Sequence, residues 1–250
     1  MSQPPAAADS GPTPAEDRPP RHGFQGDRGA APPVRAVPAG LTIAVSRESG
    51  ARGGTIGRRV GRKLGWQVYD QELLEYMAQE TAIRHDVVEP LTPQATDWVE
   101  ARLQQLLREQ NLSQHPLILH LARVVLALGA RGNVVLIGRG AGYILPRAST
   151  LHVRLISPLQ ERIAYMGQWL RLSQQEAAER VRLRDERRAE FLSTHFHHQP
   201  GDIQPFDMVL NSGTLGEDVS ADLIVRAARS RAEAFPTPPP SARMGVAPRP

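Results

Sequence analysis

The spacing of apolar residues marks a strand, a loop and a helix between residues 41 and 65. The run LTIAVS at residues 41–46 is short, rich in β-branched residues and followed by glycines, a pattern typical of a buried strand. Beyond those glycines, apolar residues recur at every fourth position from Ile56 to Leu64, with arginines and a lysine between them, and Gly65 ends the pattern. The order strand, loop, helix is therefore predicted.

Four further short apolar runs predict strands, and helical patterns lie between them. The runs are WQVYD from residue 66, NVVLIG from residue 133, LHVRLIS from residue 151 and FDMVLNS from residue 206. Helical spacing is found at residues 71–82 and again from Pro158 onward. Strands that alternate with helices are joined by right-handed crossovers into a parallel sheet with helices on both faces. The expected fold class is α/β, with a five-stranded parallel sheet in the middle of three layers.

Residues 83–131 are expected to form an all-helical insert. Thr96 is predicted to cap a helix whose apolar residues between Val99 and Leu107 share one face. Pro116 is predicted to open a second helix, since proline is favoured in the first helical turn.

The second half of the helical region that starts at Pro158 is charged almost all round. It reads SQQEAAERVRLRDERRAEFLSTHF. A helix this polar cannot lie wholly on a core, so we expect it to project over another part of the molecule or into solvent. The run HFHH at residues 195–198 ends this helix with no carboxylate at metal-ligand spacing. Exposed or phosphate-neighbouring histidines are therefore expected there.

Proline is concentrated at the two ends of the chain. Nine of the 22 prolines lie in residues 1–40 and six in residues 236–250. These ends are poor in large apolar residues and cannot bury enough surface to offset the entropy of ordering. We therefore predict disordered tails at residues 1–39 and 233–250 and one domain at residues 40–232.

Charge and cysteine content narrow the classes of function. The net charge is +4, but arginines of the two tails carry six of the positive charges. The other arginines cluster at residues 58–63 and 180–188, which favours a phosphate ligand over general binding of nucleic acid through the tails. The absence of cysteine excludes disulfides and thiolate chemistry. Without an apolar run of about 18 residues, we expect a cytoplasmic protein with no membrane segment.

The run SRESGARGGTIG at residues 46–57 follows the first strand and is the strongest candidate for a phosphate loop. In such loops backbone N–H groups and the start of the next helix point at phosphate. The strict pattern G-x-x-x-x-G-K-[ST] is absent, but Gly50, Gly53 and Gly54 precede Thr55 at the helix start. A glycine-rich turn without a ligand is the alternative. The later GRGAG, at residues 138–142, lacks the spacing of a dinucleotide fingerprint.

Four segments in order resemble the cytidylate kinase-like family, a branch of the nucleoside monophosphate kinases. They are SRESGARGGTIGRRVGRKLGWQVYDQELL, VVLIGRGAGYIL, RDERRAEFLSTHF and FDMVLNSGTLG, and the similarity covers nearly all of residues 41–230. The resemblance implies a P-loop fold with three α/β/α layers. It also implies that the insert at residues 83–131 binds the monophosphate and that residues from about 170 to 200 form a helical lid.

For the loop, the resemblance implies that ATP is held by backbone N–H groups from Gly50 to Thr55. Magnesium would be bound by the Thr55 hydroxyl. Gly53 stands at the position of the usual lysine, and Arg47 and Arg52 stand where loop glycines would be. An arginine can supply a bidentate phosphate contact in place of the lysine. The implied ATP-binding residues are Arg47, Gly50, Ala51, Arg52, Gly53, Gly54 and Thr55.

For the acceptor and the transfer, the resemblance implies a second group of residues. Arg139 resembles the arginine that holds the acceptor monophosphate, whereas Ile137 and Gly140 stand where typical members carry acids. The implied catalytic residues are Arg139, Arg184 and Arg188, and the implied substrate-binding residues are Tyr69, Asp70, Arg139 and Asp185.

The implied activity is magnesium-dependent transfer of a phosphoryl group from ATP to CMP or dCMP. The partners would be small nucleotides, with nucleic acid disfavoured and the oligomeric state left open. The alternative is a nucleotide-binding regulatory or interaction module that kept the fold without turnover. Gly53 and Ile137 favour that alternative.

Overall fold

The computed structural model describes residues 37–80, 87, 90–199 and 201–233. Within them a five-stranded sheet has the order β2-β3-β1-β4-β5, and every pairing is parallel. The strands are β1 (Thr42–Arg47), β2 (Gln67–Tyr69), β3 (Val134–Ile137), β4 (Thr150–Ile156) and β5 (Met208–Asn211). The predicted α/β class, the five strands and their parallel arrangement are confirmed.

The register brings the carboxyl ends of the three inner strands together. Val45 of β1 pairs with Ile137 of β3, and Arg47 pairs with Leu155 of β4. The loops that leave β1 and β3 therefore start side by side. Ligands of open α/β sheets bind in the crevice outside the carboxyl ends of the strands.

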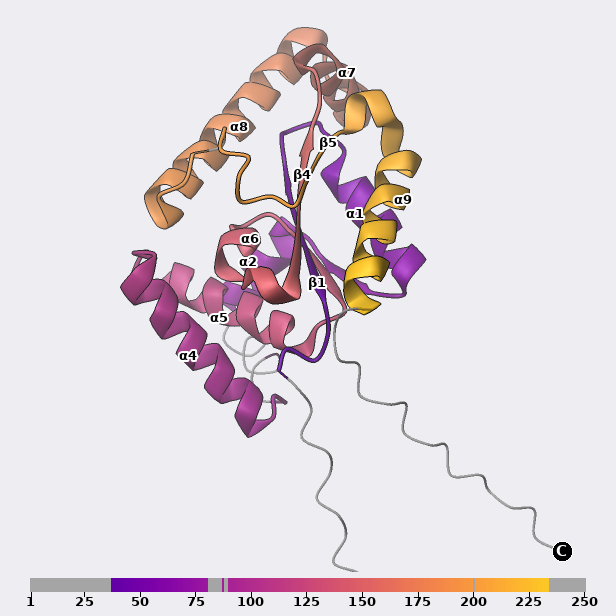
Figure 1. The fold of residues 1–250 in the computed structure, drawn as a ribbon. Helices are drawn as coiled ribbons and strands as arrows, with labels where there is room; N and C mark the ends of the chain where they lie inside the picture. Colours follow the sequence, from indigo (N-terminus) through magenta and orange to yellow (C-terminus); the bar gives the residue numbers. More distant parts are fainter. Residues whose placement is uncertain (1–36, 81–86, 88–89, 200, 234–250) are drawn as a thin grey trace, which may run out of the picture. The chain divides into compact units, whose positions relative to one another are not determined.

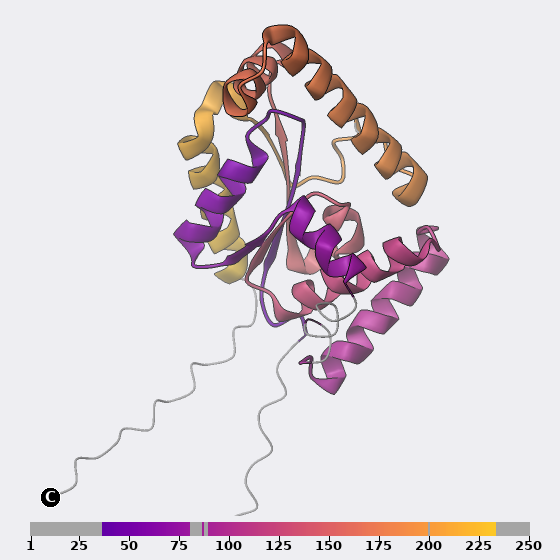
Figure 2. The same ribbon diagram turned by 180° about the vertical axis from the view of Figure 1, so that it is seen from behind.

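One face of the sheet is covered by α1 (Gly53–Leu64) and α9 (Ser212–Glu233) (Figures 1 and 2). Side chains alternate along a strand, so Ile43 and Val45 of β1 join this layer together with Ile56 and Val60 of α1. All four have exposed fractions of 2% or less. The amphipathic pattern that predicted α1 is thus explained by packing on this face.

The opposite face is covered by α2 (Gln71–Gln79), α5 (Pro116–Arg131) and the short α6 (Ala141–Ile144). Helix α4 (Pro93–Glu109) packs on α5. The second half of α5 is fully buried from Val124 to Ala130. Within the expected insert, α5 therefore packs directly on the sheet, and α4 covers α5 and adds its buried apolar side chains to the same core.

The helical region after Pro158 divides into α7 (Leu159–Leu170) and α8 (Gln174–Phe196). A short 3-10 helix, η1 (Arg147–Ser149), lies earlier, directly before β4. Arg171 ends α7 in the left-handed conformation, and Ser173 with Glu176 forms a capping box that starts α8. Only four of the 23 residues of α8 are buried and eleven are exposed, in keeping with its charge pattern. Its far end reaches the turn between α4 and α5, where the Ser113 N–H donates to the His195 carbonyl over 3.2 Å.

Two helix-end predictions need correction. Helix α4 is capped by Thr92 and not by Thr96, because the Thr92 side chain accepts a hydrogen bond from the Ala95 N–H and Pro93 takes the first helical position. Helix α2 ends at Gln79, and the last two residues of its predicted range lie outside the described residues. The predicted tails also lie almost wholly outside them. In the described part of the chain, no helix is long and apolar enough to cross a membrane.

Candidate active site

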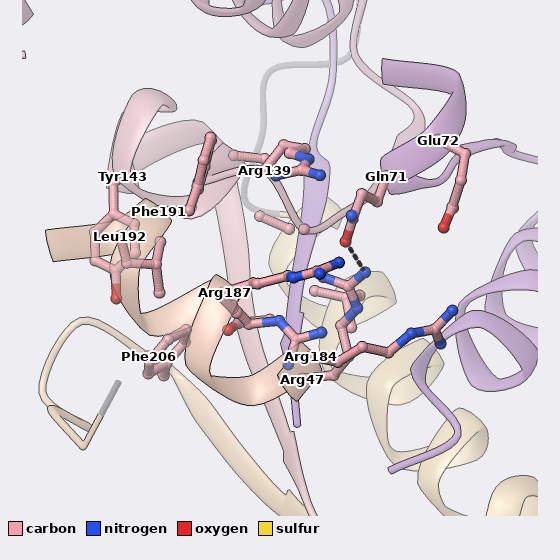
Figure 3. A pocket seen from close by; sticks show the side chains of 18 of the residues that line it. Arg47, Gln71, Glu72, Arg139, Tyr143, Arg184, Arg187, Phe191, Leu192 and Phe206 are labelled. Atoms are coloured by element: carbon pink, nitrogen blue, oxygen red, sulfur yellow. Dashed lines mark hydrogen bonds between the residues drawn. The ribbon is translucent and has the colours of Figure 1, made fainter. Parts of the chain in front are cut away.

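A pocket of about 380 Å³ lies at the carboxyl ends of β1 and β3, between α2, α6 and α8 (Figure 3). Its floor is formed by the end of β1 and by the turn after β3. Six arginines line it: Arg47, Arg139, Arg180, Arg184, Arg187 and Arg188. Glu72 is the single carboxylate among the lining residues. Such an excess of positive charge in a concave site favours a ligand with several negative charges.

Helix α8 supplies four of these arginines from one face. Arg180, Arg184 and Arg187 follow one another at spacings of four and three residues, which places them on one side of the helix. All three are exposed, and none has an ion-pair partner among the described residues. Arg188 is half-buried and pairs with Asp185 over 2.7 Å. The structure thus brings Arg184 and Arg188 to the same pocket as Arg139.

Arg139 stands on a turn of unusual backbone geometry. Gly138, Arg139 and Gly140 have φ angles of 86°, 51° and 69°, all in the left-handed region. Glycine adopts this region without steric cost, so the two glycines permit the turn that lifts Arg139 toward the pocket. The guanidinium pairs with Glu75 and lies 4.8 Å from the centre of the Phe191 ring. Its position is fixed from two sides.

Arg47 is a half-buried cation without a carboxylate partner among the described residues. Its Nη2 donates to the Gln71 Oε1 over 2.9 Å (Figure 3). Burial lowers the pKa of Arg47 to about 9, and the nearby charges of Arg188 and Arg139 act in the same direction, against Glu72. An anion bound in the pocket would supply the missing counter-charge.

The side chain of Arg47 crosses directly over Gly53. A Cβ atom at position 53 would lie 2.7 Å from the Arg47 Cγ and 2.9 Å from its Cβ, distances that real contacts do not show. The guanidinium then reaches Gly138, where a Cβ atom would collide with it. A lysine at position 53 and an arginine at position 47 therefore cannot keep these positions together. The glycine at the lysine position is the space that Arg47 uses.

The first turn of α1 offers unpaired backbone donors. The first N–H groups of a helix have no partner within the helix, and no side chain among the described residues caps the first turn of α1. The helix begins at Gly53, directly beneath the stem of Arg47. Gly53, Gly54 and Thr55 therefore present backbone N–H groups and the positive end of the helix dipole, an arrangement that can bind an anion. The Ala51 N–H, which was also expected to bind phosphate, instead donates to the Glu48 carbonyl over 3.2 Å.

Asp185 does not point at the pocket as a free group. Its carboxylate accepts from the Ser49 N–H over 2.8 Å, from Arg162 over 2.6 Å and from Arg188 over 2.7 Å. Arg162 also donates to the Ser49 carbonyl, and its charge lies 3.4 Å from Glu48. The carboxylate expected to bind substrate thus ties α8 to the phosphate loop. Sequence reasoning missed Arg162 and Glu48, whose partners are distant along the chain.

Tyr69 and Asp70 lie beside the pocket and not in its lining. Tyr69 donates to Gln67 over 2.5 Å, and partial burial raises the pKa of its hydroxyl. Asp70 caps α2 by accepting from the Leu73 N–H over 3.1 Å. The next two residues, Gln71 and Glu72, line the pocket instead. Tyr69 and Asp70 thus lie next to the pocket, and the side chains that line it come from the two residues after them.

The described residues do not build a magnesium site of their own. No group of three or more acids or histidines gathers anywhere in this part of the chain. The Thr55 hydroxyl lies 3.3 Å from the Tyr165 hydroxyl. Ile137, at the expected acid position, is buried in the core, and the Phe196 ring covers Gly140. Thr55 therefore offers a single hydroxyl oxygen, whose hydrogen-bond partner among the described residues is the Tyr165 hydroxyl.

The histidines at the end of α8 pack against aromatic rings. His195 meets Phe191 edge to face with ring centres 5.0 Å apart, and burial followed by the charge of His115 lowers its pKa. His198 stacks on Tyr143 at 4.1 Å. Tyr143 and Phe191 also line the pocket, and sequence reasoning identified neither of them.

Most of the chain matches a known protein family. The model of the cytidylate kinase-like family matches residues 42–214. The cytidylate kinase of Ignicoccus hospitalis is 27% identical over 120 residues, which are 48% of this chain and 70% of that protein. The uronate isomerase of Corynebacterium glutamicum is 32% identical over 103 residues, 41% of this chain, and the chain spans only 20% of that protein's length.

Among solved structures, an uncharacterized protein from Eubacterium ventriosum has a TM-score of 0.53 at 16% identity, covering 76% of this chain and 99% of that one. The shikimate kinase of Bacteroides thetaiotaomicron has a TM-score of 0.40 at 15% identity, with coverages of 77% and 98%. At 16% identity, the protein from Eubacterium ventriosum supports the fold of this chain and nothing further.

Proposed function

The chain belongs to the cytidylate kinase-like family, and we propose that it is a nucleoside monophosphate kinase that phosphorylates CMP or dCMP with ATP. One observation carries the proposal: six arginines converge on one pocket, and the stem of one of them, Arg47, lies over Gly53 at the uncapped start of α1. Phosphoryl transfer needs such an arrangement, because catalysis consists mainly of positioning and of stabilising negative charge.

The loop and Arg47 would hold the donor. Backbone N–H groups at the start of α1 would bind the β- and γ-phosphates of ATP. Arg47 crosses Gly53 and ends near Gly138, so its guanidinium lies between the loop and the acceptor pocket. It would supply the positive charge that a lysine supplies in other phosphate loops, from a strand end and not from the helix.

Arg139 would hold the phosphate of the acceptor, with its guanidinium kept in place by Glu75 and Phe191. An oxygen of that phosphate attacks the γ-phosphorus, the bond to the β–γ bridging oxygen breaks, and ADP leaves with the electron pair. The negative charge spreads over the equatorial oxygens of the transferring group. Arg184, Arg187 and Arg188 on α8 would stabilise this charge, most strongly when the ligands exclude water.

Magnesium would enter the site bound to ATP as part of the substrate. The phosphates and water would provide most of its ligands, which magnesium tolerates because it keeps several waters. The Thr55 hydroxyl is the donor that this chain would add.

A second candidate function is a nucleotide-binding regulatory module without turnover. The observation that favours it is the apolar Ile137 at the position of the expected acid, buried against the core with an exposed fraction of 1%. Such a module would bind ATP through the same loop and leave the acceptor unchanged.

A turnover assay separates the two candidates. The purified full chain is incubated with magnesium, ATP and each common nucleoside monophosphate in turn, and formation of the diphosphate is followed. Selective phosphorylation of CMP or dCMP is expected. Tight binding of ATP without phosphorylation of any monophosphate would contradict the kinase and favour the regulatory module.

A further inference from the structure

Two aromatic residues of α7 form a stacked pair that the arginine pocket does not use. Tyr165 and Trp169 are one helical turn apart, with ring centres separated by 6.1 Å and planes inclined by 16°. Trp169 is 63% exposed, the highest exposed fraction among the large hydrophobic side chains that the structure describes. A rigid aromatic face held open to solvent is a ready surface for a planar ligand.

This pair is joined to the phosphate loop by two contacts. The Tyr165 hydroxyl lies 3.3 Å from the Thr55 Oγ1, at the first turn of α1. The guanidinium carbon of Arg52, the last loop residue before α1, lies 5.2 Å from the centre of the Tyr165 ring. The aromatic surface therefore begins where the phosphate-binding N–H groups are presented and extends outward to Trp169.

The sheet order places the aromatic pair and two pocket residues, Arg139 and Gln71, on opposite sides of β1. Arg139 and Gln71 follow β3 and β2, which lie on one side of β1. Helix α7 follows β4, which lies on the other side. In-line transfer requires the acceptor and the leaving diphosphate on opposite sides of the γ-phosphorus. With the acceptor held by Arg139, the leaving diphosphate would lie toward the α7 side, where Tyr165 and Trp169 are.

We propose that Tyr165 and Trp169 form the platform on which the base of the donor nucleotide stacks. The inference rests on the proposed function for the place of the phosphates and adds the recognition of the base. Arg52 lies on the same surface, where its charge is available to the phosphates or the ribose of a stacked nucleotide. Stacking is effective for any base because each presents a π-face. Inorganic tripolyphosphate, which has the phosphates and no base, should not use this platform.

The test measures binding of ATP and of tripolyphosphate without an acceptor. The chain has three tryptophans, so the double variant Trp66→Phe, Trp98→Phe leaves Trp169 as the single tryptophan. ATP should change its fluorescence, and tripolyphosphate should bind by calorimetry with little change. In the otherwise unaltered chain, Trp169→Ala should weaken ATP binding about tenfold or more and leave tripolyphosphate binding unchanged. Trp169→Phe should restore most of the loss.

The matched control is Leu159→Ala, another exposed apolar side chain of α7, at 52% exposure, which should bind both ligands like the unaltered chain. Equal losses for ATP and tripolyphosphate in Trp169→Ala, or no loss for either, would overturn the platform even if CMP is phosphorylated. Base-dependent fluorescence with no turnover of any monophosphate would support the platform and remove the proposed kinase activity. The two proposals thus fail separately.

Discussion

Helix α8 has two arginine-bearing faces that differ in their neighbours. On the outer face Arg182 pairs with Glu179 and Glu186, each over 2.6 Å, and all three side chains are more than half exposed. On the face toward the pocket, Arg184 and Arg187 have no carboxylate partner among the described residues. Along the sequence both faces are only a run of charges. The position of the carboxylates decides which arginines serve the helix and which are available to a ligand.

The largest effect is expected at Arg47, which lines the same pocket from the end of β1 and, like Arg184 and Arg187, has no carboxylate partner among the described residues. Arg47→Ala should lower kcat for CMP phosphorylation about 100- to 1,000-fold, the range found when a preorganised charge-stabilising donor is removed. Binding of ATP through the backbone loop should change much less. Steady-state kinetics and calorimetry measure the two effects. A higher KM with an unchanged kcat would show that Arg47 binds substrate without stabilising the transition state.

A slightly smaller effect is expected when the usual loop lysine is restored at position 53. Gly53→Lys should lower kcat about 100-fold, because the new side chain displaces the stem of Arg47, and misplacement by about 1 Å can have this effect. The double variant Arg47→Gly, Gly53→Lys removes the collision and should recover part of the activity. If Gly53→Lys alone is as active as the unaltered chain, Arg47 is not in the place of the lysine.

The pH dependence of kcat/KM should reveal the lowered pKa of Arg47. Its pKa is lowered to about 9, chiefly by burial, so the free protein loses this charge as the pH rises through 9. We expect kcat/KM to fall about tenfold for each pH unit above that value. The unfolded chain retains the proton there, so the contribution of Arg47 to stability rises over the same pH range. Activity should therefore fall while the protein stays folded.

The pH fall in kcat/KM should be absent from Arg47→Ala, which has no proton to lose at this position. In kcat the fall should move to higher pH, because bound phosphates favour the charged form of Arg47. A profile of Arg47→Ala identical in shape to that of the unaltered chain would assign the fall to another group.

The fold could be predicted from the sequence further than the site could. Buried parallel strands are short apolar runs, so β1, β3 and β4 were recognisable from the local runs of apolar residues. The break between α7 and α8 was missed, because Arg171 takes a left-handed conformation that glycine usually marks. The cap of α4 was predicted at Thr96, four residues too late, although Thr92 directly precedes a proline, which is favoured at the first helical position.

The site was predictable where it depends on one segment and not where it depends on side-chain paths. The glycine-rich loop and the arginines of α8 were identified because each is contiguous. The hydrogen bond from the Ser49 N–H to the Asp185 carboxylate joins residues 136 positions apart, and no local sequence pattern indicates it. The crossing of Arg47 over Gly53 depends on how the loop turns back over the end of β1. That geometry explains the missing lysine, which the sequence alone left open.

The smallest effect is expected on the outer face of α8, and it completes the comparison. Arg182→Ala removes two exposed ion pairs, which solvent screens, so the free energy of unfolding should fall only slightly. Turnover of CMP should stay within about twofold, whereas Arg184→Ala on the same helix should reduce kcat markedly. Chemical denaturation and the turnover assay measure the two quantities. Equal losses of activity in both variants would mean that the arginines act through the helix and its overall charge, and that the unpaired face has no special role.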